Sequence, residues 1–198
     1  MPITFAIPTS RDTLVASLAE VDRQASALWR SFSPEEFFTR PADGGWSPAQ
    51  NVSHLRAGTV PIIWTLKTPK PILTVLFGKA RAASRSFEEI RDRYQRVLAS
   101  GKGAGPFTPR KKRMPSDPAQ AQAKALEAWQ QLIPRLTAGI ATWPEADLNR
   151  YHVLHPLIGK LTVLEMLYFT LYHLSRHANV VAGRREQSIR VSSVAGAN

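Results

Sequence analysis

The sequence predicts an all-α protein, a four-helix bundle with long connections between its helices. Four substantial segments carry apolar residues at helical spacing, most of them begin at a capping residue, and no run alternates apolar and polar residues for long enough to predict a strand. With 198 residues, of which 43% are hydrophobic, the chain is large enough for one such core. We expect a single helical domain over residues 1–183, followed by a mobile polar tail at 184–198.

The first predicted helix covers residues 9–31. Its apolar side chains recur every three or four positions, and Thr9 or Ser10 can cap its first turn. A much shorter helical turn is predicted at Ser33-Pro34-Glu35-Glu36, because proline is favoured at the first helical position. Residues 40–46, with two consecutive glycines, are expected to form a loop.

A second long helix is predicted to begin at Ser47-Pro48 in the same way. It runs toward Pro61, which we expect to kink or end it, because proline lacks an N–H group and its ring meets the preceding turn. Residues 67–82 contain further prolines and are predicted to be irregular. Helical spacing returns from Phe87 to Leu98, with arginine on the outer side.

The clearest predicted loop covers residues 101–118, where glycine, proline and the basic run Arg110-Lys111-Lys112-Arg113 gather. Its glycines do not form a phosphate-binding loop, because no strand precedes them and their spacing is wrong. Asp117-Pro118 caps the next predicted helix, which covers roughly residues 118–139. A short turn is predicted at Trp143-Pro144-Glu145.

The last helix is predicted from near Thr162 to near Gly183. Thr162 and Glu165 have the spacing of a capping box, so we expect a structural role for Glu165. The polar residues of this helix form one narrow stripe and almost everything else is apolar. Most of its circumference is therefore predicted to be buried.

His173 and His177 lie away from that polar stripe, one helical turn apart among apolar neighbours. A single buried histidine is usually a hydrogen-bonded core residue. Two histidines on one inward arc would repel each other if protonated, and burial disfavours their charged form. A shared metal ion explains both positions, while hydrogen-bonded core histidines are the alternative. Zinc proteases use the same HxxxH spacing, but Leu174 stands where those enzymes need a glutamate.

The chain contains no cysteine, which excludes disulfides, thiolate zinc sites and cysteine nucleophiles. Any metal ion must therefore be held by His, Asp or Glu. Nothing in the sequence has the pattern of a nucleophile elbow or a Ser-His-Asp set. Four polar or aromatic residues are candidates to line a site, with packing or surface positions as the alternative: Trp46, Asn51, Tyr168 and Tyr172.

Three segments follow one another in an order that matches a known family. They are Gly45-Trp46-Ser47-Pro48-Ala49-Gln50-Asn51-Val52-Ser53-His54-Leu55, His155-Pro156-Leu157-Ile158-Gly159-Lys160-Leu161-Thr162 and Tyr172-His173-Leu174-Ser175-Arg176-His177. Together they resemble the DinB-like (YfiT-related) superfamily of metal-binding four-helix bundles. The resemblance covers residues 10–183, within which the long basic region 67–116 does not align.

This resemblance implies a bundle in which one histidine of the second helix and two of the last bind a divalent metal ion. Carried over residue by residue, it implies His54, His173 and His177 as the ligands. Zn²⁺ and Ni²⁺ both suit imidazole. Three imidazoles leave a coordination position open for water or a small thiol, which is typical of catalytic sites. His155, in the motif before the last helix, is expected to hydrogen-bond its own loop, with a place in the site as the alternative. His152 is expected to lie at the surface.

The resemblance implies an enzyme with a small-molecule substrate, either a metal-dependent hydrolase or an S-transferase that depends on a low-molecular-weight thiol. The net charge of +11 suggests an alternative from another class, a basic nucleic-acid-binding protein, although a solvated basic surface explains the same charge. The basic runs lack interleaved aromatic residues and any recognition motif, so we expect no specific nucleic-acid partner. A helical metal-binding protein without catalysis is a third alternative.

The first residues of the chain lack the features of a signal peptide, and no segment is apolar enough to span a membrane. We therefore expect a soluble, cytoplasmic protein with no membrane partner. The assembly that we consider is a homodimer.

Overall fold

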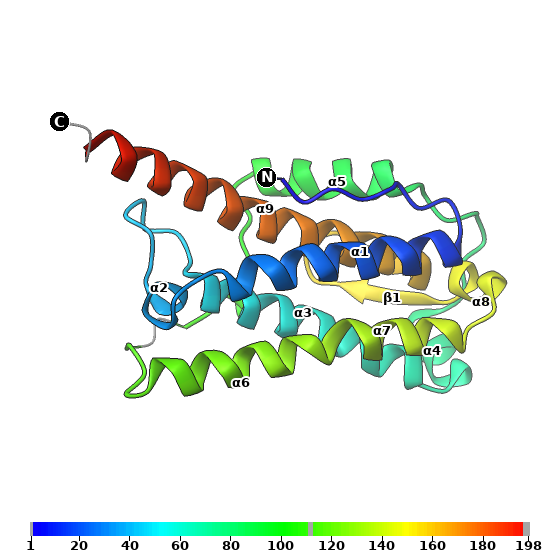
Figure 1. Cartoon of the computed structure of the whole chain (residues 1–198). Coiled ribbons are helices and arrows are strands. Elements are labelled where there is room, and N and C mark those ends of the chain that lie inside the picture. Colours follow the sequence, from blue (N-terminus) through cyan, green and yellow to red (C-terminus); the bar gives the residue numbers. More distant parts are fainter. Residues whose placement is uncertain (1, 111–112, 196–198) are drawn as a thin grey trace.

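A computed structural model describes residues 2–110 and 113–195 of the chain. Four long helical segments run side by side as a bundle, which confirms the predicted fold class: α1, α3, α6 with α7, and α9 (Figure 1). The elements in chain order are α1 (Arg11–Arg30), α2 (Pro34–Phe38), α3 (Pro48–Lys67), α4 (Lys70–Phe77), α5 (Phe87–Ala99), the 3-10 turn η1 (Gly105–Phe107), α6 (Pro118–Gln130), α7 (Leu132–Ala141), α8 (Glu145–Arg150), β1 (His152–His155), β2 (Gly159–Thr162) and α9 (Val163–Ala195).

The bundle core begins with the apolar stripe of α1. Leu14, Leu18 and Val21 of this stripe are completely buried, as their spacing on one helical face predicts. Each such side chain contributes about 2 kcal/mol to the free energy of unfolding. At the other end of α1, the ring of Trp29 packs edge-to-face against Trp129 of α6, with the centroids 5.9 Å apart. The last contact fixes α1 against α6, and α1 also packs along α9, which carries two of the site residues described below.

Most helices begin at the predicted caps. Ser10, Ser33 and Ser47 cap α1, α2 and α3, and each accepts a hydrogen bond from the backbone N–H three residues later. Asp117 caps α6 in the same way. The cap at Ser47 sets where α3 starts, and therefore where His54 lies along the bundle.

Pro61 was expected either to end α3 or to kink it. It does not end the helix, which continues to Lys67. Proline removes one intrahelical hydrogen bond, but the turns that follow it are fixed by tertiary contacts. Ile63 is buried, and the indole N–H of Trp143 donates to the carbonyl oxygen of Leu66 at 2.8 Å. These contacts stabilise the helix beyond the proline.

The segment 67–82 is not irregular throughout, because α4 occupies its middle. Pro69 stands at the N-cap of α4 and Pro71 lies in its first turn. In these positions the missing N–H group has no intrahelical partner to lose. The prolines therefore start a helix here instead of preventing one.

The predicted helix over residues 118–139 is divided into α6 and α7 at Gln131. Pro134 explains the break, because it cannot donate to the carbonyl four residues before it. The preceding segment 101–118 is mainly a loop, as predicted, with the single turn η1 inside it. Lys111 and Lys112 of its basic run lie outside the described residues.

A short antiparallel hairpin precedes α9, which the sequence did not predict. Its register pairs His152 with Thr162 and His155 with Gly159. Each strand has four residues, too few for an alternating pattern to stand out. At the turn, Gly159 has a φ of 78°, a left-handed backbone conformation that glycine adopts without strain. The hairpin packs against α4, α8 and α9, at one end of the bundle.

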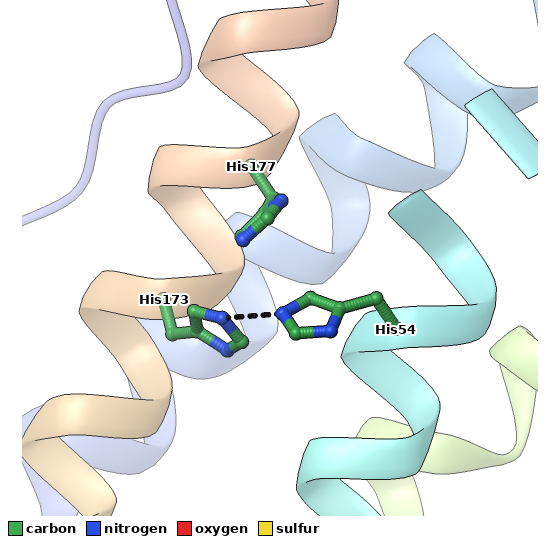
Figure 2. A group of neighbouring side chains, drawn as sticks. All are labelled: His54, His173 and His177. Atoms are coloured by element: carbon green, nitrogen blue, oxygen red, sulfur yellow. Dashed lines mark hydrogen bonds between the residues drawn. The ribbon is translucent and has the colours of Figure 1, made fainter. Parts of the chain in front are cut away.

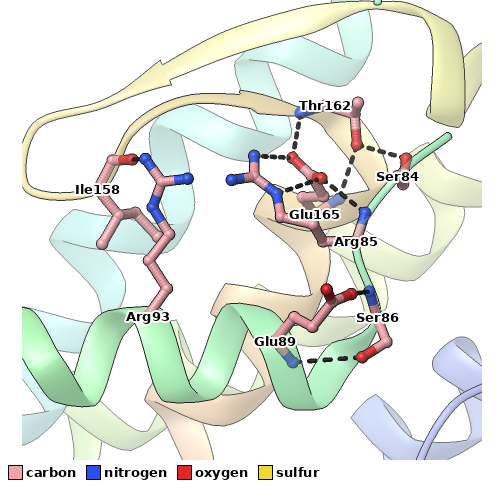
Figure 3. A network of polar contacts seen from close by, with 8 residues as sticks. All are labelled: Ser84, Arg85, Ser86, Glu89, Arg93, Ile158, Thr162 and Glu165. Carbon is pink, nitrogen blue, oxygen red and sulfur yellow. Dashed lines mark hydrogen bonds and ion pairs between the residues drawn. The ribbon is translucent and has the colours of Figure 1, made fainter. Parts of the chain in front are cut away.

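A buried polar network holds the start of α9 (Figure 3). The carboxylate of Glu165 accepts the backbone N–H of Thr162 at 2.9 Å, and the hydroxyl of Thr162 accepts that of Glu165 at 3.1 Å, which forms the predicted capping box. The side chain of Arg85 donates to both carboxylate oxygens at 2.9 Å, and its backbone N–H donates at 2.8 Å. Glu165 therefore has the structural role expected for it.

The last helix continues past Gly183 to Ala195, so the predicted helix end at Gly183 is wrong. No proline follows Gly183, and a glycine inside a helix costs only about 1 kcal/mol. Arg184, directly after it, forms an ion pair of 2.8 Å with Asp43, which joins the extension to the loop before α3. The predicted tail is thus helical as far as it is described, and residues 196–198 lie outside the described residues.

None of the described helices combines the length and the hydropathy needed to cross a membrane.

Candidate metal centre

Three buried histidines from two helices meet in the bundle core (Figure 2). His54 comes from α3, while His173 and His177 lie one turn apart on α9. One ring nitrogen of each lies within 4.8 Å of those of the other two, and Nε2 of His54 is 3.0 Å from Nε2 of His173. The structure thus brings together the three residues that the sequence singled out. We call them the histidine cluster.

Asn51, one turn before His54 on α3, fixes the orientation of His177. The amide nitrogen of Asn51 donates to the carbonyl oxygens of Trp46 and Ser47, at 3.2 and 3.0 Å, so its amide oxygen is the atom that faces the ring. That oxygen accepts from Nδ1 of His177 at 2.8 Å. Because Nδ1 carries the proton, Nε2 of the neutral ring has an available lone pair.

A loop fixes His54 in the same way. Its Nδ1 lies 2.9 Å from the carbonyl oxygen of Phe107 in η1. A carbonyl can only accept, so Nδ1 donates and Nε2 has the lone pair, on the side of His173. Histidines that bind metal ions usually donate their second N–H to such an oxygen. Two of the three histidines therefore have the outer partners typical of metal ligands.

Aromatic rings surround the histidine cluster. Trp46 stacks on His177, with centroids 5.7 Å and planes 14° apart, and meets the edge of His54 at 4.8 Å. Phe169 stacks on His173, with centroids 5.1 Å and planes 20° apart. These rings restrict rotation of the imidazoles and form an apolar shell, which limits access of water to the cluster.

Burial keeps the histidine cluster uncharged. It lowers the pKa of His177 to about 3 and lowers the pKa of His173 well below its usual value, and the neighbouring histidines add to both effects. Burial also lowers the pKa of His54, although the hydrogen bond to Phe107 acts in the opposite direction. Metal ions bind the neutral form of imidazole. At neutral pH the three side chains are therefore in the form that a metal ion needs.

The donor set of the histidine cluster fits a divalent transition metal. Three imidazole nitrogens, with no described carboxylate in the group, favour Zn²⁺ or Ni²⁺ over Mg²⁺ or Ca²⁺, which prefer oxygen ligands. Three protein ligands leave at least one coordination position for water or a substrate atom. The residues present therefore fit a metal site of the catalytic type.

A cavity of about 200 Å³ adjoins the histidine cluster. His54 and His173 form part of its wall. Gly58 lies beside them, so that a Cβ atom added there would be 3.8 Å from the ring of His173. The other walls come from α3, α4, α5, η1, the β1–β2 hairpin and α9. A small molecule in this cavity can therefore contact two of the three histidines.

The four other candidate residues separate into two pairs. Asn51 and Trp46 contact the histidine cluster, as described above. The hydroxyl of Tyr172 instead lies 2.9 Å from Nε2 of Gln95, and the ring of Tyr168 packs on Phe87. Packing or a surface position, the alternative considered for all four, therefore holds for the two tyrosines.

The two remaining histidines differ in their relation to the site. Nδ1 of His155 accepts hydrogen bonds within its own turn, as expected, but His155 also lines the cavity. His152, expected at the surface, is half-buried.

The carbonyl of Phe107 and the ring of Phe169 were not predicted. Phe169 lies four residues before His173 on α9, so its contact with that ring follows the helical spacing.

The fold and the site can be compared with known proteins. The family model described as the DinB superfamily matches residues 17–181. Among solved structures, the chain is similar to YfiT from Bacillus subtilis, which is described as a probable metal-dependent hydrolase with an unusual four-helix bundle topology. The two are 18% identical, with a TM-score of 0.62 over 92% of this chain and 90% of that chain, so the likeness concerns the fold. No curated protein matches the chain.

Proposed function

The chain belongs to the DinB superfamily, and from this premise we propose that it is a metal-dependent enzyme whose divalent ion is bound by His54, His173 and His177. The observation that carries the proposal is the convergence of three buried, neutral imidazoles beside a cavity. A purely structural cluster of polar side chains would need no neighbouring space for a substrate. Three protein ligands next to a cavity are instead typical of catalytic metal sites.

The chain's own residues have defined tasks in this proposal. Asn51 and the carbonyl of Phe107 each hold one imidazole in the tautomer that directs Nε2 toward the centre. Trp46 and Phe169 hold the rings in place and limit access of bulk water. When bound, a divalent ion supplies Lewis-acid chemistry, the activation of water or of a thiol at neutral pH.

We propose two reactions, hydrolysis and S-transfer from a low-molecular-weight thiol. The description of YfiT as a probable metal-dependent hydrolase supports the first. The second is the other reaction that the family resemblance implies, and since the chain has no cysteine, its thiol would have to be an external one. The substrate in both reactions is a small molecule, since the cavity measures only about 200 Å³.

The test combines elemental analysis with two assays. The full chain is purified without a metal-affinity column, and its metal content is measured before ester hydrolysis and thiol transfer are assayed. We expect about one Zn²⁺ or Ni²⁺ per chain and an activity that is lost with a chelator and restored by the ion. Stoichiometric metal without either activity would instead favour a non-catalytic metal-binding protein.

A further inference from the structure

The tautomer of His155, at the end of β1, is fixed by its own turn. Its Nδ1 accepts two backbone hydrogen bonds, from the N–H of Leu157 at 3.1 Å and from that of Ile158 at 3.2 Å. A nitrogen that accepts cannot carry the proton, so the neutral ring has its proton on Nε2. Burial lowers the pKa of His155 to about 4, which keeps the ring neutral. His155 is therefore an Nε2–H donor.

The turn that carries His155 is held rigidly. Arg93 of α5 donates to the carbonyl oxygen of Ile158 at 2.7 Å, which joins the turn to the helix beside it (Figure 3). The ring of Phe169 meets the imidazole of His155 with the centroids 4.2 Å apart. These contacts fix both the position and the direction of the Nε2–H group.

The Nε2–H group of His155 has no hydrogen-bond partner among the described residues, yet it is not fully enclosed. In the described part of the chain, the fully buried side-chain nitrogens without a partner are those of Trp29 and Arg56. His155 lines the cavity beside the histidine cluster, and its Nδ1 faces the turn. The open side of its ring is thus the cavity side, where Nε2–H is available to a ligand.

Among the described residues that line the cavity there is no Asp, Glu, Lys or Arg, and most of them are apolar, including Ile62, Phe77, Met166 and Phe169. A charged group in such a space would lose its hydration without gaining a partner. Moving an unpaired charge from water into an apolar environment costs at least several kcal/mol. An uncharged, apolar group would instead gain from leaving water.

We propose that the cavity binds an uncharged, mainly apolar part of the substrate, such as a phenyl or short alkyl group, and that His155 Nε2–H donates to an oxygen atom of that substrate. This inference rests on the proposed function, because it places the substrate between His155 and the histidines that hold the metal ion. The cavity sets the shape and polarity of the ligand, while His155 sets the direction of its oxygen.

Two hydroxamates with the same metal-binding group test the apolar part of the proposal. Benzohydroxamate carries a phenyl ring and acetohydroxamate only a methyl group. Calorimetric titration of each into the zinc-loaded full chain should show at least about tenfold tighter binding of benzohydroxamate, from burial of the ring. Adding a carboxylate at the para position of the ring should abolish this gain.

Two variants test the donor. His155→Asn keeps an acceptor where Nδ1 accepts from the turn, but it lacks the Nε2–H group. His155→Gln places an amide N–H near the position of Nε2–H but loses the acceptor of the turn. We expect His155→Asn to weaken benzohydroxamate binding about fivefold, the effect of one neutral hydrogen bond, and to lower the melting temperature less than His155→Gln does, because it keeps the acceptor of the turn. His155→Gln should recover part of the binding at a lower melting temperature.

The outcomes separate the two proposals. If neither hydroxamate binds the zinc-loaded protein, the ion has no open position and the proposed function fails. If both bind equally well, the proposed function stands and the apolar cavity is overturned as the substrate site. If His155→Asn folds and binds benzohydroxamate as tightly as the natural chain, the donor role is overturned. Independently, long-range ¹H–¹⁵N NMR of the natural chain must show the Nε2–H tautomer of His155, and the Nδ1–H tautomer would also overturn that role.

Discussion

Nδ1 of His177 lies 2.8 Å from Oδ1 of Asn51, although the two residues are 126 positions apart in the chain. The contact joins α9 to α3 at the level of the histidine cluster. It also fixes which nitrogen of His177 is available, because the amide nitrogen of Asn51 is already bound to two backbone carbonyls. A side chain outside the proposed ligand set therefore fixes the orientation of one proposed ligand.

Asn51→Ala should weaken metal binding without removing a ligand. Loss of an outer partner of a metal-bound histidine typically costs 10- to 100-fold in affinity, and we expect a loss of about this size when Zn²⁺ is titrated in competition with a chelator. Asn149→Ala is the matched control, because Asn149 also donates to the carbonyl four residues before it but lies on α8. Equal affinities in the two variants would contradict the role of Asn51.

His177→Ala should lose most of the bound metal, since it removes one of three ligands. The helix should survive, because alanine is the best helix former. His152→Ala is the control, as His152 lies on β1 outside the histidine cluster. Elemental analysis after dialysis should find little metal in the first variant and unchanged metal in the second. Equal, stoichiometric metal in both would place the site elsewhere.

The bundle could be predicted because its signals are local. The caps at Ser47 and Thr162 and the spacing of apolar residues act within one or two turns, and all of them appear in the structure. Two of the errors occurred where tertiary contacts outweigh a local rule. The contact of Trp143 with Leu66 stabilises α3 beyond its proline, and the ion pair of Arg184 supports α9 beyond Gly183.

The site could be predicted only in part. The spacing of His173 and His177 shows that both face inward, but His54 was assigned to them through the family resemblance. Asn51 lies one turn before His54 on the same helix, and this spacing is a signal that could have placed it near the cluster. The contact between His54 and the carbonyl oxygen of Phe107 could not be predicted. Every residue has a backbone carbonyl, so the identity of a residue 53 positions away in a loop gives no indication of this contact.

Glu165→Gln should destabilise the protein by about 2–4 kcal/mol at pH 7, because it leaves the partly buried Arg85 without its charged partner. The hydrogen bonds with Arg85 and Thr162 lower the pKa of Glu165 although burial opposes them. The stability that its charge provides is therefore complete above the ordinary value of 4.5 and lost as the pH falls through the lower pKa of the folded state. Urea unfolding should therefore show that the difference in the free energy of unfolding between the natural chain and Glu165→Gln becomes smaller below pH 4.5. A difference that grows in acid would contradict the assigned ion pair.

Nucleic-acid binding should be weak and non-specific. Six of the basic side chains already pair with carboxylates: Arg11, Arg23, Lys70, Arg85, Arg91 and Arg184. Arg110 and Arg113 are exposed on a loop, not on a helix that could enter a groove. Fluorescence anisotropy with duplex DNA should show affinity that falls by about 0.9 log units per log unit of salt for each phosphate neutralised. Tight, sequence-selective binding at physiological salt would reverse the ranking of the two functions.

His155 should make the fold sensitive to mild acid. Burial lowers its pKa from 6.5 to about 4, so the unfolded chain takes up a proton at this residue before the folded chain does. The free energy of unfolding should therefore decrease as the pH falls from 6.5 toward 4, by about 3 kcal/mol from this group. His155→Asn keeps the acceptor of the turn but cannot titrate, so it should lack this part of the decrease. Because every other titrating group is shared, the difference in stability between the natural chain and the variant reports on His155 together with its coupling to His173. It should shift in favour of the variant across this range, and a difference independent of pH would show that the ring of His155 is as accessible to protons in the folded chain as in the unfolded one.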